Sequence, residues 1–101
     1  MGTRKYPPLT PLEIEDIILR RGFEHYKNSG DHRFYVHEVK GKKHIVQIDM
    51  GNPLYEGHWL KLVIEESGMT REQFYCSTKS SARKLGLKKA EKEELINWAI
   101  S

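Results

Sequence analysis

The chain has a single cysteine, Cys76, among its 101 residues. One cysteine excludes an intramolecular disulfide and any metal site built from several thiolates. No run approaches the ~20 consecutive apolar residues of a membrane span, and the N-terminal segment lacks the apolar core of a signal peptide. Seventeen Lys and Arg against fourteen Asp and Glu leave a net charge of only +3. We therefore expect one small cytoplasmic domain without a membrane partner, whose charge permits a nucleic-acid partner without requiring one.

The first predicted element is a helix over residues 10–21. Thr10 supplies a capping hydroxyl, Pro11 stands at the first helical position, and Glu13 follows the cap by three residues. Gly22 after two arginines is typical of a helix end. The predicted apolar face consists of Leu12, Ile14, Ile17 and Ile18, with Leu19 as an optional member.

Three segments with strand character follow, at 23–27, 32–40 and 43–49, separated by turn-forming residues at 28–31 and 41–42. Aromatic and β-branched residues dominate the middle segment. The three segments and the turns between them predict an antiparallel meander. Both faces of the middle strand carry apolar groups, so the alternation leaves open which face is buried.

A second helix is predicted over residues 58–67, with Trp59, Leu60, Val63 and Ile64 on one apolar stripe. A short helix opening at Thr70 and including Phe74 follows. The order predicts an α+β fold, an α-β-β-β-α sandwich with helices on one face of a three-stranded antiparallel sheet.

The last quarter of the chain differs in composition. Residues 77–89 carry five basic residues and no acid, which is typical of a solvated linker, and residues 90–100 have the pattern of an amphipathic helix. We therefore divide the chain into a domain at 1–76 and, as an extension of it, a basic linker and C-terminal helix at 77–101.

Basic residues are concentrated between positions 20 and 43, interleaved with histidines and aromatics, which suits an RNA backbone. The alternative is an ordinary solvated sheet face. The basic residues are Arg20, Arg21, Lys27, Arg33, Lys40, Lys42 and Lys43.

His32 is the candidate for acid–base chemistry. It follows a tight turn at the start of a strand, where backbone holds it while solvent reaches it. A histidine with an ordinary pKa near ~6.5 can take or give a proton at neutral pH. The alternative is an ordinary exposed histidine. The spacing of the five histidines shows no metal-ligand pattern, so we expect neither metal nor cofactor. Trp59 and Trp98 are interpreted as core or interface residues.

Three motifs, in this order over residues 10–75, carry a resemblance to a known family. They are Gly22-Phe23 at a helix end, Gly30-x-His32-x-Phe34-Tyr35 at a strand start, and Ser67-Gly68-Met69-Thr70-Arg71-Glu72-Gln73-Phe74 after the second long helix. The chain thereby resembles the HicA family of small toxins, the mRNA interferases of bacterial toxin–antitoxin pairs.

The resemblance implies a fold like the double-stranded-RNA-binding domain (dsRBD), endoribonuclease activity on mRNA, and a HicB-like antitoxin partner. The family's catalytic histidine falls on His32. A histidine that removes the proton of an RNA 2′-hydroxyl lets that oxygen attack phosphorus and needs no metal. The expected products are a 2′,3′-cyclic phosphate and a 5′-hydroxyl. The candidate RNA-binding and charge-stabilising residues are Lys27, Arg33, Lys40, Lys42 and Lys43.

Three positions depart from the family pattern. Gln47 and Asp49 stand where a proline and a histidine are common, and Glu56 stands where a lysine is common. These replacements motivate an alternative, a non-catalytic RNA-binding module of the same fold. A further alternative is a protein-interaction domain that uses the apolar end of the C-terminal helix, residues 95–100. The oligomeric state stays open.

Overall fold

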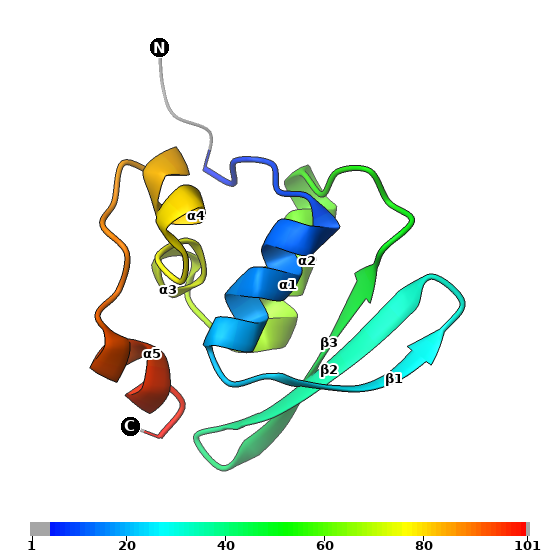
Figure 1. Ribbon diagram of the computed structural model, residues 1–101, viewed down its shortest axis with the longest axis horizontal. Coiled ribbons are helices and arrows are strands. Elements are labelled where there is room, and N and C mark those ends of the chain that lie inside the picture. Colours follow the sequence, from blue (N-terminus) through cyan, green and yellow to red (C-terminus); the bar gives the residue numbers. More distant parts are fainter. Residues whose placement is uncertain (1–4, 101) are drawn as a thin grey trace.

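The computed structural model describes residues 5–100, in which a three-stranded antiparallel sheet of order β1-β2-β3 is covered by helices on one face (Figure 1). The elements are α1 (Pro11–Arg20), β1 (Glu24–Ser29), β2 (His32–Val39), β3 (Lys42–Asp49), α2 (Gly57–Ser67), α3 (Arg71–Tyr75), α4 (Lys79–Lys84) and α5 (Lys92–Asn97). The predicted α+β, dsRBD-like α-β-β-β-α sandwich with a helical C-terminal extension is thus confirmed. None of the helices in residues 5–100 has the length and apolar character needed to span a bilayer.

Helix α1 begins with the predicted capping box. The backbone N–H of Glu13 donates to the Thr10 hydroxyl (3.2 Å), and the Thr10 N–H donates to the Glu13 carboxylate (2.8 Å). The buried stripe is narrower than predicted, because Leu12 is 65% exposed and Leu19 also faces solvent. A helix lying on a sheet buries only the residues spaced three and four apart that point at the sheet.

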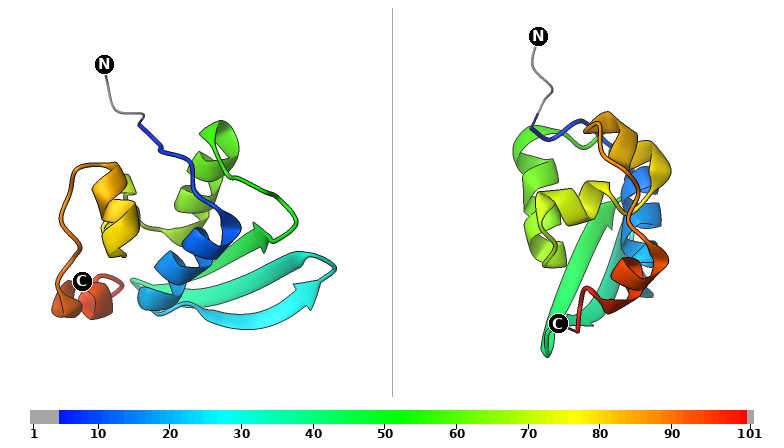
Figure 2. Two further views of the ribbon diagram at one scale, coloured as in Figure 1. Left: turned by 45° about the horizontal axis from the view of Figure 1, so that its top comes forward. Right: turned by 90° about the vertical axis from the view of Figure 1, so that its left-hand side faces the viewer.

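Packing on the helices decides which sheet face is buried. Tyr35 of β2 pairs with Val46 of β3, and both side chains are buried under the helices with Ile48. The opposite face carries His32 and Phe34 of β2 and has no helix over it (Figure 2). The face open to solvent therefore carries the candidate catalytic histidine.

The basic segment 77–89 is not a plain linker, since helix α4 lies within it. Thr78 caps the helix by accepting from the backbone N–H of Ser81 (3.1 Å), and Ser81 and Ala82 are buried. Small side chains on one side let this turn of helix pack on the domain while the basic side chains stay in solvent. This helix was missed because one turn is too short for a periodic apolar pattern.

Arg21 joins the C-terminal extension to the body of the domain. Its guanidinium is fully buried and donates to the Ser77 hydroxyl (2.8 Å), the Gln73 carbonyl (2.6 Å) and the Glu94 carboxylate (2.5 Å). The Trp98 indole N–H donates to the Arg21 carbonyl (2.8 Å). Arg21 is therefore buried and is not part of the basic surface predicted for residues 20–43.

The apolar end of the extension packs on the domain. Leu95, Trp98 and Ala99 are buried, as the core interpretation of Trp98 predicted, and the Ala99 carbonyl accepts from the backbone N–H of Lys40 at the β2–β3 turn (2.5 Å). Most of the apolar residues that suggested an interaction helix are therefore occupied within the molecule itself.

His37 lies in the contact between β2 and the C-terminal extension. Its ring is 5.3 Å from that of Phe23 and 6.0 Å from that of Trp98, centroid to centroid. Burial lowers the pKa of His37, the neighbouring His44 lowers it further, and the carboxylates of Glu24 and Glu38 oppose this. His37 in the unfolded chain has the ordinary, higher pKa and takes up a proton more readily than in the folded protein. Acid therefore favours unfolding.

We expect the free energy of unfolding to be fully developed above the ordinary histidine pKa and to fall as the pH drops from about 7 to about 5. Urea unfolding at several pH values measures this slope. His37→Gln removes the titrating ring, so its slope over that window is expected to be shallower than that of the wild type. Equal slopes would show that His37 does not contribute.

Candidate functional site

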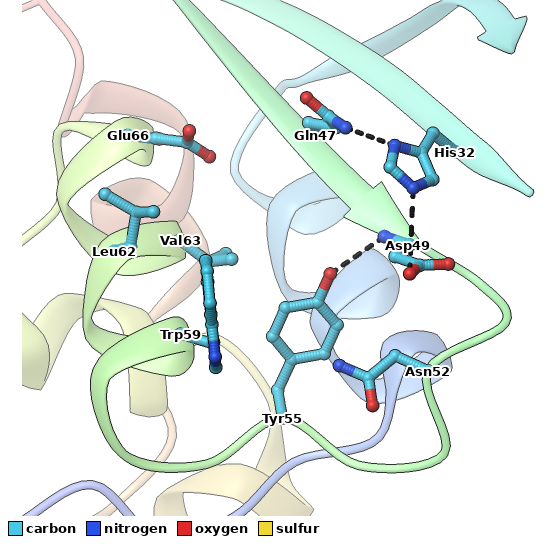
Figure 3. A pocket seen from close by; sticks show the side chains of 9 residues that line it. All are labelled: His32, Gln47, Asp49, Asn52, Tyr55, Trp59, Leu62, Val63 and Glu66. Carbon is cyan, nitrogen blue, oxygen red and sulfur yellow. Dashed lines mark hydrogen bonds and ion pairs between the residues drawn. The ribbon is translucent and has the colours of Figure 1, made fainter.

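A pocket of about 330 Å³ lies where the outer edge of β3 meets helix α2 (Figure 3). Strands β2 and β3 contribute three polar side chains, the loop after β3 contributes two, and α2 contributes one mostly apolar face. The lining residues are His32, Gln47, Asp49, Asn52, Tyr55, Trp59, Leu62, Val63 and Glu66.

His32 stands at the mouth of this pocket, as the first residue of β2. In the antiparallel register it pairs with Asp49, and Gln47 lies two pairs along on the same face. Its Nδ1 contacts the Gln47 side-chain amide, and its Nε2 is 3.6 Å from Asp49 Oδ2 (Figure 3). Strand β3 therefore orients the imidazole from both nitrogens while two fifths of the side chain stays exposed (41%).

These two contacts suit both protonation states of the ring. With the Gln47 amide N–H donating to Nδ1, a neutral ring carries its proton on Nε2, toward the Asp49 carboxylate. In a protonated ring both nitrogens donate, to Asp49 and to the oxygen of a rotated Gln47 amide. Both protonation states of His32 thus find a partner, and a substrate group that exchanges a proton with the ring takes the place of one of the two neighbours.

Asp49 is itself fixed. Its backbone N–H donates to the Tyr55 hydroxyl (2.8 Å), and its Oδ1 accepts from the Gly51 N–H (2.9 Å), which leaves Oδ2 toward His32. A Cβ at Gly51 would come within 3.0 Å of the Asp31 carboxylate. Glycine therefore allows the loop after β3 to pack closely against Asp31. Burial raises the pKa of Tyr55 and keeps it a neutral hydrogen-bonding group.

One residue of the apolar stripe predicted for helix α2 is not buried. Leu60, Val63 and Ile64 are buried as predicted, but Trp59 is 63% exposed and its indole lies over the pocket (Figure 3). It begins a second stripe with Leu62, Val63 and Glu66, spaced three, four and seven residues along the helix. Trp59 is thus a surface aromatic of the pocket rather than a core residue.

Glu66 is a pocket residue that the sequence analysis missed, as it missed Asn52 and Tyr55. Burial raises the pKa of its carboxyl group, and the backbone N–H of Gln47 at the sheet edge opposes this. The signal that points to Glu66 is its position seven residues after Trp59, on the same face of α2. Glu56, by contrast, stands at the N-cap of α2 and is not part of the pocket lining.

Of the five predicted RNA-binding residues, Lys27 alone shares the face of His32 near the pocket. A bulge in β1 places Tyr26 and Lys27 opposite Phe34, and the Lys27 ammonium is 4.8 Å from the centre of the Phe34 ring. The Tyr26 ring meets Phe34 edge to face at 6.2 Å. The result is an aromatic and cationic cluster (Tyr26, Lys27 and Phe34) two residue pairs from His32.

The other four lie elsewhere. Arg33 points to the helix-covered face, where it pairs with Glu15 (2.9 Å), which also binds the Tyr35 hydroxyl. Lys40, Lys42 and Lys43 surround the β2–β3 turn, in which Lys40 takes a left-handed conformation (φ 53°). Strand β2 has eight residues, so this turn is roughly 23 Å from His32. The structure therefore does not gather the five cations into one surface.

The pocket is acidic, with Asp49 and Glu66 in its lining. Among residues 5–100, no three His, Cys, Asp or Glu side chains gather in an arrangement suited to a metal ion. The chain matches no protein-family model, and no curated protein matches it significantly. The HicA resemblance therefore stays a prediction from the residue pattern.

Proposed function

We propose that this protein is a HicA-like endoribonuclease that acts on mRNA in the cytoplasm without a metal ion, and that His32 is its catalytic residue. The observation that supports this most is the setting of His32, which is partly exposed at the mouth of a pocket and contacted on both ring nitrogens by Gln47 and Asp49. A HicB-like antitoxin is the expected protein partner.

The chemistry uses the nucleophile that RNA carries. His32 accepts the proton of a 2′-hydroxyl, that oxygen bonds to the adjacent phosphorus, and the bond from phosphorus to the 5′-oxygen breaks. The leaving 5′-oxygen takes a proton from water, and the protonated His32 returns its proton to solvent, which leaves a 2′,3′-cyclic phosphate and a 5′-hydroxyl. The substrate hydroxyl has to displace one of the two contacts of the ring. Lys27, on the same face, is the cation placed to offset the charge of the phosphorane.

The test is cleavage of end-labelled single-stranded RNA by the purified protein in excess EDTA. We expect cleavage to persist in the chelator and to produce fragments with 2′,3′-cyclic phosphate ends. An RNA with one 2′-deoxynucleotide at the cleaved position should resist, because the nucleophile is missing. Loss of activity in EDTA, cleavage of the deoxy substrate, or no cleavage of any RNA would each contradict the proposal.

A second candidate is a non-catalytic RNA-binding module. The specific observation in its favour is the cluster of exposed Tyr26, Lys27 and partly buried Phe34, since aromatic rings beside a cation bind bases and phosphates without cleaving them. RNA binding that weakens steeply with salt, without any cyclic-phosphate product, would favour this module over the ribonuclease.

A further inference from the structure

We propose that the α2 wall of the pocket binds one nucleobase of single-stranded RNA and prefers guanine, with Trp59 stacking on the base and Glu66 accepting its hydrogen bonds. This inference rests on the proposed function and deepens it, because it names the part of the substrate that enters the pocket.

Trp59 supplies the stacking surface. It is the most exposed aromatic ring named at the pocket, and its indole lies over the cavity while the neighbouring His58 ring meets it edge-on at 5.3 Å. Leu62 and Val63 continue the apolar wall beneath it. A flat, water-exposed indole beside an apolar wall is the surface on which proteins stack unpaired bases.

Glu66 supplies the selectivity. It lies about 10 Å along α2 from Trp59, on the same helix face, so a base stacked on the indole can direct its edge toward the carboxylate. A carboxylate has two acceptor oxygens and no donor. Guanine offers two adjacent donors, N1–H and the 2-amino group. Adenine and cytosine offer one donor next to an acceptor, and the one donor of uracil lies between two carbonyls.

The acidic character of the pocket agrees with this occupant. The carboxylates of Asp49 and Glu66 would repel a phosphate within the pocket, whereas a base carries no charge there. With the base inside, its ribose and phosphate lie at the mouth, beside His32 (Figure 3). Lys27 lies on the same face of the sheet, opposite Phe34. A duplex cannot place a base in this way, because pairing occupies the edge that Glu66 would bind.

The test uses 2′-O-methyl RNA tetramers that differ in one base and cannot be cleaved by attack of the 2′-oxygen. Binding is followed by tryptophan fluorescence, since the chain has two tryptophans, exposed Trp59 and buried Trp98. We expect quenching that survives in Trp98→Phe, and affinity for the guanine tetramer about 10-fold or more above that for the uracil tetramer.

Variants separate the two roles. Because these variants lack the Trp59 reporter, their binding and that of the wild type are compared by the fluorescence anisotropy of a dye-labelled tetramer. Trp59→Ala should weaken binding of every tetramer by about 10-fold, with Trp59→Phe in between. Glu66→Gln should remove the guanine preference and keep the stacking. Glu65→Gln, an exposed carboxylate on the same helix, is the matched control and should bind like the wild type.

Unchanged binding by Trp59→Ala would overturn the stacking site, and preference for another base would overturn the role of Glu66. The two proposals fail separately. Guanine-selective quenching without cleavage of natural RNA would refute the ribonuclease and support this inference. Cleavage by Trp59→Ala with the wild-type rate and product pattern would support the ribonuclease and refute this inference.

Discussion

Replacing His32 by alanine is expected to lower the rate of RNA cleavage by about 10²-fold or more while the fold stays intact. General acid–base catalysis by a positioned histidine contributes about 10²–10⁴-fold. The side chain lies partly exposed at the mouth of the pocket, where Gln47 and Asp49 are its polar neighbours, so its loss leaves no core cavity. Cleavage of labelled RNA under single-turnover conditions measures the effect, and growth arrest on expression is expected to disappear with it.

His25→Ala is the matched control for this experiment. His25 is also an exposed histidine of the sheet. Its ring nitrogen bonds to the neighbouring Asn28 side chain (2.6 Å), and its ring lies 5.4 Å from that of Tyr35. We expect wild-type cleavage from it. Thermal unfolding of both variants should match the wild type. If His32→Ala folds and cleaves as fast as the wild type, then His32 is not the catalytic residue.

Replacing Arg21 by alanine is expected to lower the free energy of unfolding by about 3 kcal/mol or more. The guanidinium is fully buried, and its removal takes a donor from the buried Ser77 hydroxyl, from the Gln73 carbonyl, which keeps the Ser77 hydroxyl as a donor (2.8 Å), and from the partly exposed Glu94 carboxylate. Buried acceptors without a donor keep their desolvation cost. The cavity next to Trp98, over which the guanidinium lies at 5.7 Å, adds to this loss. Urea unfolding measures the change.

Arg20→Ala is the control, because the chain offers two adjacent arginines in different settings. Arg20 is half exposed and pairs only with Asp16 one helical turn away (2.9 Å). Such exposed pairs contribute about 0.5 kcal/mol or less. Arg21→Lys should also destabilise strongly, since an ammonium lacks the planar fork that reaches separate acceptors. Equal losses in the free energy of unfolding from Arg20→Ala and Arg21→Ala would refute the stabilising role proposed for Arg21.

The same contacts join residues 77–100 to the rest of the domain. The extension supplies Ser77, Glu94 and Trp98 around Arg21, and Trp98 closes over Phe23 and His37. Removing the extension would therefore expose core surface rather than release an independent arm.

Local structure was largely determined by the sequence. The capping box at Thr10, the turn before His32 and the left-handed Gly68 (φ 78°) that ends α2 each depend on residues a few positions apart. These features act over one turn of backbone, so their residue types suffice to predict them. The element order and the place of His32 at a strand start followed from them.

Burial and proximity were decided only by the tertiary structure. Phe34 and Tyr35 are both aromatic neighbours on one strand, and only the position of the helices makes Tyr35 core and leaves Phe34 open. Arg21 is buried while Arg20 is exposed, because the extension folds back over one of them. The pocket joins His32 to Trp59 and Glu66 from distant segments. Residue type and periodicity describe what a side chain can do, but which partner reaches it depends on how whole elements pack against one another.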